Sequence, residues 1–243
     1  MNRSFALVLV GAAVLLGIES SAGAPAPKQP KEEPPGPITD EQLQTTTNNL
    51  KQIALAWHNH EAVHGHFPSN EMDKKGKALL SWRVQILPYI EELPLYQKFK
   101  LGEPWDSENK KLIDQMPKLF APVRGKAEAG MTFYQSFAGE KALLKPGRKV
   151  KTAAITDGLS ATFMVAEAAK PVTWTKPDDL VFDGNEVPKL GGMFDGKFHA
   201  AFCDGSVRRF KKGLDPDLLK LLIDPQDGTR IPPEIGVDNE DKK

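Results

Sequence analysis

Residues 39–63 carry the longest periodic pattern in the chain, and this pattern constrains the fold more than any other feature. Thr39 and Gln42 have the spacing of a capping box, which predicts that a helix begins here. Gly65 and Pro68 end the pattern. Apolar residues recur mostly in steps of three, four or seven and predict one apolar helix face; they are Leu43, Leu50, Ile53, Ala54 and Trp57.

The rest of the chain changes character at Pro117. Before it, weaker helical patterns cover 79–92, 95–99 and 107–116, with Pro88 bending or ending the first. After it come short runs rich in Val, Phe, Thr and Ile, which predict strands at 131–138, 150–155, 161–168 and 198–210. Asp204 and Gly205 divide the last run as a hairpin turn, and 215–223 could be a short closing helix. Helices first and strands later predict an α+β fold, with the long N-terminal helix packed on an antiparallel sheet.

Residues 1–22 have the layout of a secretory signal peptide: Arg3, an apolar run over 5–18, then small residues. As a helix, the 14-residue run would be about 21 Å long, short of the roughly 30 Å of a bilayer core. Cleavage after Ala22 fits best, with cleavage after Ala24 or an uncleaved anchor as alternatives. We therefore expect an exported protein, periplasmic or extracellular, with no stable membrane span after cleavage.

The expected domain organisation follows from composition. Residues 23–37 are rich in proline and lack large apolar side chains, which predicts an extended linker over 23–38. Residues 39–223 form one α+β domain, and 224–243 form a polar C-terminal tail. Lys and Arg number 32, as do Asp and Glu, so there is no broad basic field of the kind that drives nucleic-acid binding.

Few residues suggest catalysis. The chain has one cysteine, Cys203, which excludes a disulfide framework and any site built from several thiolates. His199 lies four residues before it, about 13 Å away along a strand, too far for a nucleophile–base pair. No phosphate-binding loop, dinucleotide fingerprint or nucleophile elbow is present. We predict a protein that is not an enzyme, with a secreted hydrolase as an alternative.

Four histidines fall within nine residues, at His58, His60, His64 and His66. His60 and His64 are spaced to share one helix face, which makes them weak candidates for a metal site. No carboxylate or thiolate has the spacing of a known site, so we predict neither a metal nor a cofactor. Calcium binding is a further alternative, although solvated turn residues are the better interpretation; the acidic residues concerned are Asp178, Asp179, Asp183 and Asp195.

Ligand or partner binding is predicted at two polar loops. Trp105 and Trp174 are large aromatic residues in polar surroundings, where they could stack on a ligand or hold the loop together. Asp178 and Asp179 follow Trp174 in the same loop. These four residues are the candidate site.

An ordered set of motifs resembles the planctomycete-expanded family of domain of unknown function 1559, also described as solute-binding-protein-like family 10. They include 48–56 (NNLKQIALA), 58–59 (HN), 65–68 (GHFP), 80–83 (LSWR), 103–107 (EPWDS), 156–160 (TDGLS), 174–180 (WTKPDDL) and 202–207 (FCDGSV). The resemblance covers roughly 46–210. It implies an exported protein related to pseudopilins of type II secretion, with a pilin-like head of helix and antiparallel sheet. No activity or catalytic residue is implied.

Two departures from that pattern matter. The chain has no prepilin-type leader, so it cannot pack into a pilus core in the usual way. Phe194 stands where many members place a histidine. Together these features predict an exported, non-enzymatic protein that binds a cell-envelope or secretion-system partner or a ligand. The alternative is an extracytoplasmic binding module for a sugar or peptide.

Overall fold

Helix α1 (Asp40–His64) is the longest element of the computed structural model, which describes residues 36–229 and 231. The capping box is confirmed, because Thr39 Oγ1 accepts from the amide of Gln42 while the Gln42 side chain accepts from the amide of Thr39. The helix ends at Gly65, whose φ of 74° places it in the left-handed region and whose amide donates to Glu61. The signal peptide predicted over 1–22, and residues 23–35 of the predicted linker, lie outside the described residues.

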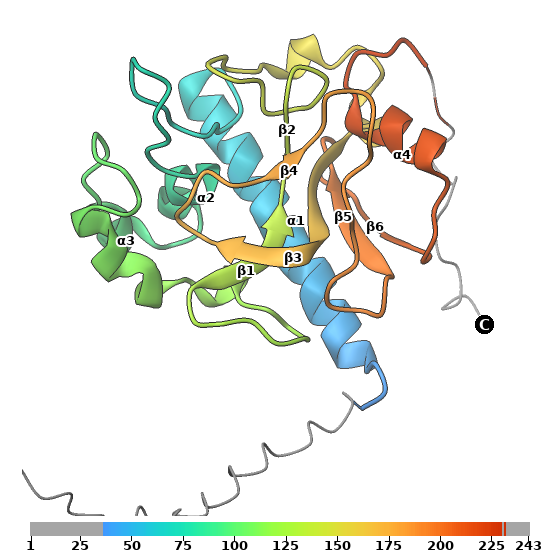
Figure 1. Ribbon diagram of the computed structural model, residues 1–243, viewed down its shortest axis with the longest axis horizontal. Coiled ribbons are helices and arrows are strands. Elements are labelled where there is room, and N and C mark those ends of the chain that lie inside the picture. The colour runs from blue at the N-terminus through green and yellow to red at the C-terminus, as the bar shows by residue number, and fades with distance from the viewer. Residues whose placement is uncertain (1–35, 230, 232–243) are drawn as a thin grey trace, which may run out of the picture. The chain divides into compact units, whose positions relative to one another are not determined.

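Four antiparallel strands form the main sheet, in the order β1 (Met131–Gln135), β3 (Phe163–Thr173), β5 (Phe198–Phe202) and β6 (Val207–Phe210) (Figure 1). The hairpin between β5 and β6 turns at Gly205, whose φ is 84° and whose amide donates to Phe202. A separate parallel pair joins β2 (Phe137–Ala138) to β4 (Leu180–Val181). The predicted α+β class is therefore confirmed.

The sheet buries an apolar core on each face. Leu50, Ile53 and Trp57 of α1 belong to the first core, and α1 contacts β3, β5 and β6. The second core is formed by phenylalanines of the strands and by the closing helix α4 (Pro216–Ile223). Alternation along β5 accounts for the division, since Phe198 and Phe202 belong to the second core and Ala201 to the first.

The segments between α1 and β1 contain only short helical elements. They are α2 (Trp82–Gln85), η1 (Leu87–Tyr89), α3 (Leu93–Tyr96), η2 (Glu108–Gln115) and η3 (Lys118–Phe120). The helical pattern predicted over 79–92 forms two short elements: α2 ends at Gln85 and η1 begins at Leu87. The interruption lies close to Pro88, which is expected to bend or end the helix because it has no amide hydrogen with which to continue it.

The strand predicted over 150–155 is wrong. This segment holds the 3₁₀ turn η4 (Thr152–Ala154), and a second turn, η5 (Leu159–Ala161), precedes β3. The backbone of the segment is occupied elsewhere, since Val150 accepts from the amide of Phe67 and the amide of Thr152 donates to the side chain of Glu61. No helix within 36–229 is long and apolar enough to cross a bilayer.

Candidate functional site

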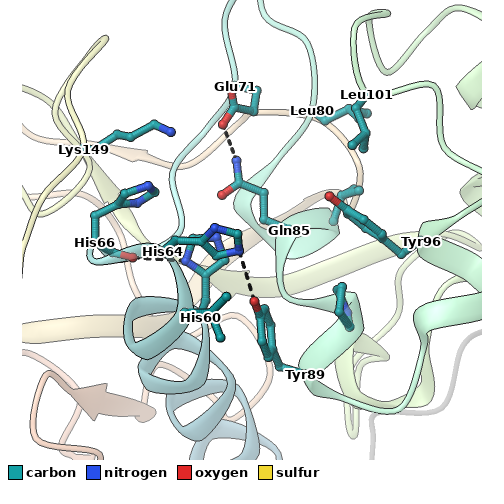
Figure 2. Close-up of a pocket in the computed structure, with 13 residues that line it drawn as sticks. His60, His64, His66, Glu71, Leu80, Gln85, Tyr89, Tyr96, Leu101 and Lys149 are labelled. Carbon is teal, nitrogen blue, oxygen red and sulfur yellow. Dashed lines mark hydrogen bonds between the residues drawn. The ribbon is translucent and has the colours of Figure 1, made fainter.

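A cavity of about 550 Å³ opens beside the C-terminal end of α1 (Figure 2). Its wall combines imidazole and phenol rings, aliphatic side chains and two charged groups. The lining residues are His60, Val63, His64, His66, Glu71, Leu80, Val84, Gln85, Pro88, Tyr89, Tyr96, Leu101 and Lys149. They come from α1, the loop that follows it, α2, η1, α3, the segment after α3 and the loop before η4.

Hydrogen bonds to backbone carbonyls show which ring nitrogen of His60 and of His66 carries a hydrogen. Nδ1 of His60 lies 3.1 Å from the carbonyl oxygen of His66 (Figure 2). Nδ1 of His66 lies 2.7 Å from the carbonyl oxygen of Phe67. A carbonyl oxygen can only accept, so each of these Nδ1 atoms carries a hydrogen and donates it. Burial lowers the pKa of His60 to about 4, so this ring is neutral at pH 7.

The rings of the cavity pack against one another. The centroids of His60 and His64 are 4.3 Å apart with planes tilted by 36°, and His60 lies 5.8 Å from Tyr89. Nε2 of His64 is 3.1 Å from the hydroxyl of Tyr89 (Figure 2). These contacts hold the aromatic wall in place without a ligand.

The opposite part of the wall carries a positioned carboxylate. Gln85 donates from Nε2 to Oε1 of Glu71 at 2.6 Å and accepts from the amide of Ser69 through its own Oε1 at 3.1 Å (Figure 2). Burial and the nearby charge of Glu71 raise the pKa of Tyr96. The charge of Lys149 contributes to the lowered pKa of His60, after burial as the main cause. Both charges therefore act on groups inside the cavity.

His60 and His64, the weak metal candidates, both line this cavity. Their ring centroids are 4.3 Å apart and their planes are tilted by 36°, while His60 Nδ1 faces the carbonyl of His66 and His64 Nε2 faces the hydroxyl of Tyr89. Within the residues that the structure describes, no group of three or more His, Cys, Asp or Glu side chains is arranged to hold a metal ion.

Two of the four residues predicted to bind a ligand lie in the core. Trp174 has no exposed surface; its Nε1 donates to the carbonyl of Ile113 at 2.9 Å and its ring stacks on Phe120 at 6.0 Å. The side chain of Asp179 is also fully buried and pairs with Arg83 at 2.9 Å. The structure therefore gives Trp174 and Asp179 packing and ion-pairing roles, which replace the surface contacts expected of them.

The other two predicted residues lie near one another at the surface. Lys176 Nζ stands 5.7 Å from the centre of the half-buried Trp105 ring and 2.6 Å from Asp178 Oδ2. Lys176 thus joins Trp105 to Asp178, although neither lines the cavity. Binding at this pair stays a prediction.

A buried acid–histidine pair lies at the adjoining strands β3 and β5. Oε2 of Glu167 accepts from the amide of His199 at 2.7 Å and from its Nδ1 at 2.8 Å. Burial raises the pKa of Glu167, and the bonds from His199 oppose that shift. Cys203 is buried as well, which raises the pKa of its thiol and disfavours a reactive thiolate. None of these three residues lines the cavity.

The cavity residues Glu71, Gln85, Tyr89, Tyr96 and Lys149 were not predicted. Tyr89 and Tyr96 sit in patterns that read as short amphipathic helices, where an aromatic residue is expected to fill the core. Lys149 reaches the cavity from a segment more than 80 positions after His66, the last histidine of the cluster, and no spacing in the sequence signals that contact.

Comparisons with known proteins bear on the N-terminal part of the domain. Residues 45–123 match the family described as Protein of unknown function (DUF1559). The match runs from within α1 through η3 and includes every cavity residue except Lys149. The resembling motifs from 156 onward lie outside it. No curated protein and no solved structure matches the chain.

Proposed function

We propose that this chain, whose residues 45–123 belong to the DUF1559 family, is a binding protein that holds a small organic solute in the cavity beside α1. The cavity itself is the observation that carries the proposal. Ligand sites in proteins are typically concave, of about 300–1,000 Å³, and largely apolar with a few placed polar groups. At about 550 Å³, with aliphatic, phenol and imidazole walls, this cavity fits that description.

A binding role accounts for the chemistry of the wall better than catalysis does. His60 has a pKa of about 4 and donates to a backbone carbonyl, so it is a weak base at neutral pH. Its hydrogen-bond partner is not a carboxylate that would raise its basicity. Glu71 is held by the amide of Gln85, and the residues that line the cavity include no serine, threonine or cysteine to act as a nucleophile. The groups are placed to recognise a molecule, which supports a protein without enzymatic activity.

The expected site of action is outside the cytoplasm. The N-terminal 22 residues have the pattern of a secretory signal peptide, and this pattern supports export to the periplasm or beyond. Partners in the envelope or in a secretion system, and a pseudopilin-like role, stay predictions; the surface pair of Trp105 and Asp178 is where such a partner would be sought. The intact mass of the protein recovered from the extracytoplasmic fraction tests export, since it distinguishes the cleaved chain from the full-length one.

The binding proposal is tested with two matched substitutions on α1. Val63 is 67% exposed and lines the cavity, whereas Leu55 is 60% exposed on the same helix and does not line it. A panel of sugars, amino acids and short peptides is screened by thermal shift and then by calorimetry. Val63→Trp should weaken the binding of a ligand that occupies the cavity, because the larger side chain takes up part of that space, whereas Leu55→Trp should leave binding unchanged. A panel with no ligand, or a ligand unaffected by Val63→Trp, would contradict the proposal.

A further inference from the structure

The two charged side chains that line the cavity, Glu71 and Lys149, indicate which class of ligand it would bind. They are the residues that this cavity shares with a smaller neighbouring one of about 140 Å³, lined also by Ser69 and Arg148. Both charges therefore stand at the boundary between the two cavities, on one side of the larger space (Figure 2). No ion pair within 4 Å joins Glu71 to Lys149 among the described residues, so each is available to a ligand.

The carboxylate of Glu71 is prepared for a cation. Gln85 holds one of its oxygens at 2.6 Å, and Ser69 in turn holds Gln85, so the carboxylate is oriented before any ligand arrives. Its second oxygen accepts no hydrogen bond from the described part of the chain. Such an oxygen, placed in advance beside a cavity, favours a protonated amine over a neutral group.

The remainder of the cavity suits an apolar body. Leu80, Val84 and Pro88 supply aliphatic surface, and Tyr89 and Tyr96 supply aromatic faces. Rings of this kind bind apolar and aromatic groups by burial of surface and by edge or face contacts. The ligand should therefore have a charged end at Glu71 and Lys149 and a large apolar or aromatic end.

We propose that the solute is a free α-amino acid with a large apolar or aromatic side chain, whose ammonium group meets Glu71 and whose carboxylate meets Lys149. The two charges of an α-amino acid are attached to one carbon, which matches two opposite charges at one boundary of the cavity. A neutral sugar would form hydrogen bonds with both side chains but would leave their charges without partners of opposite sign. A peptide would present its ammonium to Glu71 but an uncharged amide to Lys149. This inference rests on the proposed solute-binding function and specifies its ligand.

The test uses three related molecules on the full-length chain: L-phenylalanine, its amide without the carboxylate, and 3-phenylpropanoate without the amine. By calorimetry at pH 7, L-phenylalanine should bind most tightly. Loss of the ammonium should weaken binding roughly 10- to 100-fold, the range for a hydrogen bond to a charged group. Loss of the carboxylate should weaken it roughly three- to fivefold, because Lys149 is exposed and its charge is screened.

Two substitutions test which protein residue contacts the ammonium group of the ligand and which contacts its carboxylate. In Glu71→Gln, which retains a side chain able to bond Gln85, L-phenylalanine and 3-phenylpropanoate should bind alike. In Lys149→Gln, L-phenylalanine and its amide should bind alike. Circular dichroism melts check that both variants fold, and Lys151→Gln, an exposed neighbour outside the cavity, is the matched control for the lost positive charge.

The outcomes separate this inference from the function on which it rests. If a sugar binds and is lost in Val63→Trp while no amino acid binds, the ligand class is wrong and the binding function stands. If amino acids bind but the differences in affinity between the three molecules persist in both charge variants, Glu71 and Lys149 do not contact the charged groups of the ligand and the inference fails. If small polar amino acids bind and L-phenylalanine does not, the assigned side-chain class is overturned.

Discussion

Substitution of Asp179 by Asn should destabilise the fold far more than the same substitution at its neighbour Asp178. Oδ1 of Asp179 accepts from Arg83 at 2.9 Å, from the indole of Trp82 at 3.1 Å and from the amide of Ser136 at 2.9 Å. Oδ2 accepts from Asn70 at 2.8 Å. Four donors from three segments of the chain therefore converge on one carboxylate.

The magnitude follows from burial. The side chains of Asp179 and Arg83 are both fully buried, so loss of the carboxylate charge leaves a guanidinium without its counter-ion and away from water. Removing one partner of a buried pair costs about 3–5 kcal/mol. Asn keeps the shape and one acceptor, so we expect about 3 kcal/mol, a large part of the roughly 5–15 kcal/mol that stabilises a domain. Asp178 is 44% exposed and pairs with Lys176, which is 40% exposed, so Asp178→Asn should cost less than about 1 kcal/mol.

Urea unfolding followed by tryptophan fluorescence measures both variants, since Trp57, Trp82 and Trp174 are fully buried. Arg83→Met gives the double-mutant cycle: combined with Asp179→Asn, it should cost less than the sum of the two single substitutions. Equal destabilisation by Asp179→Asn and Asp178→Asn, or strict additivity in the cycle, would refute the role assigned to this pair.

Two further predictions concern acid and a close backbone approach. Burial lowers the pKa of His60 from 6.5 to about 4, so between these values the unfolded chain binds more protons than the folded one. Stability should therefore fall as the pH is lowered from about 6.5 to about 4, and denaturation curves of His60→Gln should show a shallower fall; an unchanged slope would contradict the assignment. A Cβ on Gly192 would lie 2.6 Å from the carbonyl oxygens of Ala168 and Ala169, so Gly192→Ala should cost about 1–3 kcal/mol in the same urea assay. Gly102, with open space around it, is the control, and equal losses at the two glycines would show that the contact is relieved.

The elements that could be predicted from the sequence are those with local signals. The capping box at Thr39, the apolar face of α1 and the turn at Gly205 depend on residues within a few positions of one another. Their formation is therefore encoded by neighbours in the chain. The segment 150–155 shows the limit of this reasoning. Its composition favours a strand, yet it bonds to Phe67 and Glu61, contacts that only the tertiary fold supplies.

The polar composition of the stretch that holds Trp174 and Asp179 suggested that both side chains lie at the surface. Trp174 and Asp179 lie in a stretch rich in charged residues and proline, which normally lies at the surface. Both side chains are buried because the fold supplies their partners: a carbonyl at Ile113 for the indole and a guanidinium at Arg83 for the carboxylate. Arg83 and Asp179 are 96 positions apart, so neither could be inferred to satisfy the other.

The buried network and the cavity depend on the same short segments. Asn70 connects them, since its Oδ1 accepts from the amide of Trp82 while its Nδ2 donates to Asp179. Glu71 is the next residue after Asn70, and Gln85 lies on α2, the helix that begins at Trp82. The hydrogen bonds around Asp179 therefore also hold together the two backbone segments that carry Glu71 and Gln85, whose side chains bond to each other. The family match covers 45–123, which includes both segments. The LSWR motif (residues 80–83) therefore has a structural role: Trp82 and Arg83 donate to Asp179, and the helix that begins with them carries Gln85 to the wall of the cavity.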